Sequence, residues 1–210
     1  FEFESIIKVI LENIEDEPDN TVHAKMWLQA VRHSKGYTSL DDAISIIKLW
    51  YNNSGKYEIP HLEATYYLYV LYACKAISEG NSVSDFTLNE AKAYIKECKE
   101  RKVNDKFSFE WYGKGEGIKI LTSHTKVGKM NPNTRFFDKT ELLGRVEGTI
   151  ALIDDRQKGR IKLRCGLDAF FVPSNGGFEK DRDELTNVNF YIGFRQDQLM
   201  AWEVKKIGID

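Results

Sequence analysis

The feature that most constrains the fold of this chain is a change in the spacing of its apolar residues. In the first half, apolar side chains recur at helical intervals, as at Ile7, Ile10 and Ile14. From Gly144 onward they alternate with polar side chains, as in residues 160–165, which is typical of half-buried strands. The two patterns predict an α+β fold, with antiparallel helical hairpins first and a small β-barrel last.

A glycine-rich and basic stretch separates the two patterns. Strand-like residues flank the glycines at 113–117, among them Phe107 and Trp111 before them and Ile118 and Ile120 after them. This arrangement predicts a hairpin that leads into a basic connector. The predicted divisions are a helical-repeat domain at 1–104, a basic hairpin and connector at 105–143, and a barrel domain at 144–210.

Composition excludes several classes of protein. Apolar residues make up 42% of the chain and charged residues 30%, which favours a packed core over disorder. The net charge of -2 excludes a strongly basic nucleic-acid binder, so any nucleic-acid site must be a local patch. No apolar run approaches the roughly 20 residues that cross a bilayer, and we expect no membrane partner. The start at Phe1, without Met, indicates a piece of a longer protein.

Cysteine and histidine placement indicates no metal site, no cofactor and a reducing compartment. Cys74, Cys98 and Cys165 form no CxxC motif and sit in apolar segments, which predicts buried, reduced thiols in a cytoplasmic protein. No histidine pair has metal-ligand spacing. No nucleophile motif or acid–base set is visible, so we expect a non-catalytic chain, although distant residues could still form a site.

The helical half resembles degenerate tetratricopeptide repeats. Residues 40–44 and 88–92 look alike, each with a small residue at a helix crossing, but their 48-residue step exceeds that family's usual period. Ser39 and Thr87 are each predicted to open a helix with a capping box. The helix carrying Tyr66 to Tyr72 is apolar nearly all round, which predicts a central buried helix. The resemblance implies a scaffold for protein contacts.

The barrel half resembles a cold-shock-type OB-fold. Four segments agree with that family in order and spacing: Gly148-Thr149-Ile150, Lys158 to Leu163, Asp168 to Ser174, and Ala201 to Val204. The family stacks nucleic-acid bases on two aromatic side chains of the Lys-Gly strand. Here Arg160 and Lys162 stand at those positions, and Val172 and Pro173 replace a histidine and an aromatic on the next strand.

At these positions the aromatic rings that would stack on bases are replaced, and a row of cations lies along the strand instead. The predicted nucleic-acid-binding residues are Lys158, Arg160, Lys162, Arg164 and Phe170, where Phe170 keeps a stacking side chain. They predict electrostatic, sequence-tolerant contact with single-stranded RNA or DNA. Two alternatives stay open: the cations form a solubility face, or the partner is a protein bound by the barrel or by the helical repeats.

The whole order resembles the C-terminal part of large sterile-alpha-motif antiviral proteins that interferon induces, and of their bacterial relatives. The segments that carry this resemblance are residues 24–30, 113–117 and 188–194. It implies the sensor or effector-binding end of a multidomain defence protein. The sequence leaves the oligomeric state open.

Overall fold

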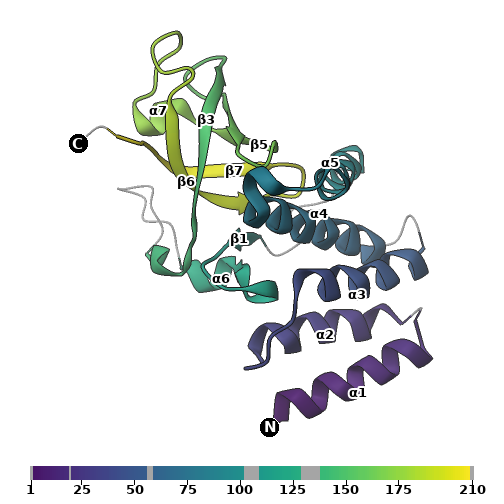
Figure 1. Cartoon of the computed structure of the whole chain (residues 1–210). Helices are drawn as coiled ribbons and strands as arrows, with labels where there is room; N and C mark the ends of the chain where they lie inside the picture. The colour runs from purple at the N-terminus through teal and green to yellow at the C-terminus, as the bar shows by residue number, and fades with distance from the viewer. Residues whose placement is uncertain (1, 19, 56–58, 102–108, 129–137, 209–210) are drawn as a thin grey trace.

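The chain folds into a stack of helices followed by a closed β-barrel (Figure 1). The computed structural model describes residues 2–18, 20–55, 59–101, 109–128 and 138–208. The main helices are α1 (Glu2–Asp16), α2 (Thr21–His33), α3 (Leu40–Asn53), α4 (Ile59–Glu79) and α5 (Asp85–Glu100). Each packs against the next along the chain, and Figure 1 shows α1 to α4 layered in sequence order. The predicted α+β fold is confirmed.

Side-chain caps set where the helices begin. Ser39 caps α3 as predicted, since its hydroxyl accepts a hydrogen bond from the backbone N–H of Asp42 at 3.0 Å. The prediction that Thr87 opens α5 is wrong by one turn. Ser84 is the N-cap and accepts from the N–H of Thr87 at 3.1 Å, while the Thr87 side chain is buried inside the first turn.

Helix α4 is the central buried helix, as its sequence predicted. The side chains from Tyr66 to Tyr72 are all buried, and Tyr66 and Tyr69 are at most 1% exposed. Gly80 ends the helix at φ +56°, in the left-handed region that glycine reaches without strain. In the described part of the chain, no helix is long and apolar enough to cross a membrane.

The predicted hairpin is present, and it docks on the helices. Strand β1 (Glu110–Tyr112) pairs antiparallel with β2 (Leu121–Ser123). Ile118 and Ile120, predicted as strand, lie instead in the 3-10 helix η2 (Gly117–Ile120). The turn is forced because the Ile118 N–H bonds the Thr38 carbonyl at 2.9 Å.

Short helices complete the connector, namely α6 (His124–Val127) and the 3-10 helix η3 (Thr140–Leu142). Phe107, residues 129–137 and the predicted division at 104/105 lie outside the described residues.

Five strands close the barrel. They are β3 (Arg145–Ile153), β4 (Gly159–Leu163), β5 (Asp168–Phe171), β6 (Asn187–Phe194) and β7 (Leu199–Lys206), with the short helix α7 (Pro173–Gly176) between β5 and β6. Around the barrel the order is β3-β4-β5-β7-β6, and β6 pairs back onto β3. Only the β5–β7 pair of this ring is parallel. This is the OB-type order expected from the sequence.

The helical stack and the barrel share one hydrophobic core. The Tyr66 hydroxyl donates to the Phe194 carbonyl at 2.8 Å and accepts from the Glu110 N–H at 3.1 Å. Arg32 of α2 donates two hydrogen bonds to the Glu110 carboxylate at 2.9 and 2.8 Å. These contacts tie α2, α4, β1 and β6 together. The three cysteines are buried and unbridged, as predicted.

Candidate nucleic-acid interface

Strand β4 holds the predicted cations on the outer face of the barrel. Arg160 and Lys162 lie within the strand and are exposed, whereas the alternating residues Ile161 and Leu163 are buried. Lys158 lies in the turn before the strand and Arg164 in the turn after it. The alternation predicted from sequence is therefore confirmed, although the strand is shorter than the cation row.

Phe170 lies beside Arg160 on the same face. The two residues are direct partners in the β4–β5 register, and directly opposed residues of neighbouring strands point to the same side of a sheet. Phe170 is half-buried, whereas Phe171, the next residue, is fully buried in the barrel core. The structure thus places one aromatic ring next to one arginine at the surface.

A concave site of about 360 Å³ lies at this pair, and we call it the Phe170 hollow. Lys158, Arg160 and Phe170 line it, together with Leu199 of β7 and Ile95 of α5. Its volume lies in the range of small-ligand sites.

The other two predicted residues line a separate hollow. Lys162 and Arg164 border a concavity of about 270 Å³, with Glu147 and Thr149 of β3 and Asn187 of β6 around them. The five predicted residues are therefore divided between two neighbouring hollows along β4.

Carboxylates from the same strands and turns partly neutralise the cation row. The ion pairs are Lys158 with Asp154 at 3.3 Å, Lys162 with Asp168 at 3.7 Å, and Arg164 with Glu147. Within the described part of the chain, Arg160 forms no ion pair. Sequence reasoning could not find the pair of Arg164 with Glu147, because the β3–β4 pairing brings Glu147 alongside, whereas Asp154 and Asp168 are close to their partners along the chain.

The cation face is open to solvent. The side chains of Lys158, Lys162 and Arg164 are 65%, 52% and 63% exposed. Exposed ion pairs contribute about 0–1 kcal/mol, so the carboxylates can be exchanged for an incoming phosphate at little cost. Helix α5 reaches the rim of the Phe170 hollow through Ile95 without covering these cations.

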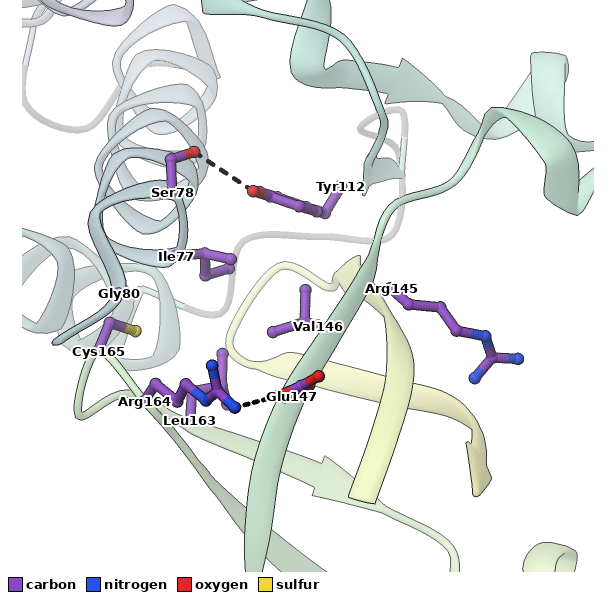
Figure 2. A pocket seen from close by; sticks show the side chains of 10 residues that line it. All are labelled: Ile77, Ser78, Gly80, Tyr112, Arg145, Val146, Glu147, Leu163, Arg164 and Cys165. Carbon is purple, nitrogen blue, oxygen red and sulfur yellow. Dashed lines mark hydrogen bonds and ion pairs between the residues drawn. The ribbon is translucent and has the colours of Figure 1, made fainter. Parts of the chain in front are cut away.

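A third hollow, which the sequence did not predict, lies at the junction of stack and barrel. It has a volume of about 320 Å³ and is lined by the end of α4, by β1, by β3 and by the end of β4. We call it the junction hollow, and Figure 2 shows its lining side chains. The Tyr112 hydroxyl lies 3.3 Å from the Ser78 hydroxyl across it. No local motif could signal this site, because its walls come from distant parts of the chain.

The glycine-rich segment 113–117 does not form a phosphate loop. The Gly113 N–H donates to the Ile120 carbonyl at 2.6 Å, and the Lys114 N–H donates to the Leu142 carbonyl at 3.1 Å. These amides are not free to cradle a phosphate. A side chain at Gly117 would meet the Thr38 carbonyl, so this glycine allows the turn to approach the helices.

A partly buried polar cluster lies within the helical stack. His61 Nε2 is 3.7 Å from Glu97, and the Tyr51 hydroxyl donates to the same carboxylate at 2.9 Å. Burial, together with the Glu97 contact, raises the pKa of Tyr51 to about 12. Arg101 also pairs with Glu97 at 2.9 Å, and these contacts within the helical stack favour a structural role for the cluster. Among the described residues, no group of three or more His, Cys, Asp or Glu side chains could hold a metal.

Comparison of the chain with protein-family models, with curated proteins and with solved structures finds no match.

Proposed function

We propose that this chain is a non-catalytic binding module that contacts single-stranded RNA or DNA through the outer face of β4 and β5. The observation that carries the proposal is the adjacency of Arg160 and Phe170 in one open hollow. A ring can stack on a nucleobase, and an arginine beside it can hold the phosphate of the same nucleotide. Both interactions tolerate any base, so binding is expected to depend little on sequence.

The remaining cations extend this site along the strand. Lys158, Lys162 and Arg164 are exposed and held by weak ion pairs, which a phosphate can replace. Contacts of this kind make binding fall steeply as salt concentration rises. With one aromatic ring in place of several, the affinity should be lower than that of a cold-shock protein, since each stacked base contributes about 1–3 kcal/mol.

The order of a helical stack followed by an OB-type barrel supports the hypothesis that this chain is part of a larger cytoplasmic protein. It is the order of the C-terminal part of the sterile-alpha-motif antiviral proteins and their bacterial relatives. On this hypothesis the chain is the nucleic-acid-sensing end of a multidomain defence protein.

The second candidate function is protein interaction through the helical repeats. Ile6 and Val9 of α1 and Val22 and Met26 of α2 are between 46% and 58% exposed, so these adjacent helices offer apolar side chains that a partner could bury. The tyrosines of α4 do not support this alternative, because they are buried in the core.

Fluorescence anisotropy of labelled single-stranded RNA and DNA tests the leading proposal. Binding should be measurable at low salt, should weaken near physiological salt, and should vanish when Arg160, Lys162 and Arg164 are all changed to Glu. A triple Glu variant of Lys8, Lys25 and Lys96, which are exposed on the helices, is the matched control. Absence of wild-type binding at low salt would overturn the proposal, and equal loss in both variants would overturn the assignment of residues.

A further inference from the structure

We propose that the junction hollow is a second nucleotide subsite, so that a bound single strand runs along β4 from the Phe170 hollow to the boundary between barrel and helical stack. This inference rests on the proposed function and extends it to residues outside the barrel. Its consequence is that the helical stack, through α4, forms part of the nucleic-acid site.

The first step of the argument is the chemical likeness of the two hollows. The Phe170 hollow combines an aromatic ring with Arg160. The junction hollow combines the ring of Tyr112 with Arg164. Each therefore has an aromatic ring and a guanidinium in its lining, the two groups that contact a base and its phosphate in other single-strand sites.

The second step is the continuity between the two hollows. Arg164 and Glu147 line both the junction hollow and the neighbouring hollow that contains Lys162. Their ion pair therefore forms the boundary between these two concavities. The chain is extended from Arg160 to Leu163, which corresponds to roughly 10 Å along the strand direction, and Arg164 follows in the turn after β4. Lys162 lies between the two arginines on the same face and can meet the intervening backbone.

The third step is the interior of the junction hollow. Ile77 and Val146 provide apolar walls, and the Ser78 and Tyr112 hydroxyls, which face each other at one side of the hollow, provide hydrogen-bonding groups (Figure 2). The Ser78 hydroxyl donates to the Cys74 carbonyl at 2.8 Å, so the Tyr112 hydroxyl donates to Ser78, and the remaining lone pairs of both oxygens can accept hydrogen bonds from a base. This mixture suits a base, which needs apolar contact on its faces and hydrogen bonds at its edge.

Arg145 is the other arginine at this hollow, and its side chain is engaged elsewhere. Figure 2 shows its guanidinium directed away from Tyr112 and Ile77. The guanidinium lies over the Tyr191 ring at 4.2 Å and pairs with Glu203 at 3.3 Å. Arg164, with its exposed side chain and weak pair, is therefore the cation that is free to change partner at this site.

Affinity as a function of oligonucleotide length tests the inference. We would measure anisotropy with oligouridylates from about 4 to about 16 nucleotides, the range of OB-fold site sizes. The wild type should gain affinity with length once the strand reaches the junction hollow. Arg164→Ala and Tyr112→Leu should each reduce affinity for long strands roughly tenfold and leave the shortest strands unaffected. Lys8→Ala, which removes an exposed charge on α1, is the control.

The outcomes separate the two proposals. Absence of binding at every length overturns the proposed function and this inference with it. Binding of short strands, with no gain with length or with a gain that both variants retain, overturns only the inference. Thermal denaturation checks that the variants fold. Photo-cross-linking of 4-thiouridine oligonucleotides to the wild type avoids variants altogether: a cross-linked peptide containing Tyr112 supports the inference, and cross-links confined to β4 and β5 contradict it.

Discussion

Two arginine–carboxylate pairs of this molecule differ mainly in their exposure to water. Arg32 and Glu110 join α2 to β1 with side chains that are 6% and 1% exposed. Arg164 and Glu147 join neighbouring strands with side chains that are 63% and 44% exposed. The side chains of the buried pair are screened from solvent, whereas the exposed pair borders two hollows. The comparison indicates that exposure separates charges that hold the fold from charges that can bind a partner.

The largest expected effect comes from breaking the buried pair. Arg32→Ala should lower the free energy of unfolding by about 3–5 kcal/mol, because the Glu110 carboxylate would stay in the core without its partner. Urea denaturation measures the change. Folded Arg32→Ala protein should bind single-stranded RNA as the wild type does.

The double variant Arg32→Met, Glu110→Leu is the control for this prediction. Removing both charges should recover most of the lost stability, since apolar groups of similar size can replace a buried ion pair. If Arg32→Ala lowers the free energy of unfolding by less than about 1 kcal/mol, the Arg32–Glu110 pair behaves like an exposed ion pair.

A second buried carboxylate, Asp183 in the barrel, should have an intermediate effect that depends on pH. The side-chain hydrogen bonds from Arg182 and Lys206, at 2.8 and 2.5 Å, hold the pKa of Asp183 well below its usual value. The ionised form therefore stabilises the folded state above the ordinary Asp pKa of about 3.9, and this contribution is lost as the pH falls toward the folded-state pKa.

Asp183→Asn should accordingly lower the free energy of unfolding by about 1–3 kcal/mol at neutral pH. The difference from wild type should shrink below about pH 4, because the unfolded wild-type chain then binds a proton at Asp183 that the folded, still ionised carboxylate does not. Urea denaturation of the wild type and of Asp183→Asn, from neutral pH down to about pH 2, measures this difference in stability. A difference that stays constant down to pH 2 would contradict the role given to the ionised carboxylate.

The smallest effect on stability should come from the exposed pair. Glu147→Gln should change the free energy of unfolding by less than about 1 kcal/mol. It should also tighten binding to single-stranded RNA a few-fold, because Arg164 loses its competing carboxylate. Glu100→Gln breaks an exposed pair with Lys96 on α5 and is the matched control, with a similar change in stability and unchanged binding. Weaker binding by Glu147→Gln would contradict the exchange of carboxylate for phosphate.

The sequence predicted the parts of this molecule whose signals are local. Helical spacing identified α4 as the buried helix, and alternation placed Arg160 and Lys162 on one face of β4. The order of motifs predicted an OB-type barrel, and the pairing of β5 with β7 agrees with it.

Features that depend on distant contacts could not be predicted in this way. Ile118 has the composition of a strand residue, but its hydrogen bond to Thr38 of the helical half holds it in a 3-10 turn. The pairing of Glu147 with Arg164 and the junction hollow both require the folded arrangement of β3, β4 and α4. Spacing along the sequence contains no information about such neighbours.

A double-mutant cycle on Arg160 and Phe170 tests the central claim most directly. Binding of labelled oligouridylate at low salt would be measured for wild type, Arg160→Ala, Phe170→Ala and the double variant. If both side chains hold the same nucleotide, each single change weakens binding, and the double change weakens it by less than the sum of the two free-energy changes. Unchanged binding in both single variants would show that the outer face of β4 and β5 is not the nucleic-acid site.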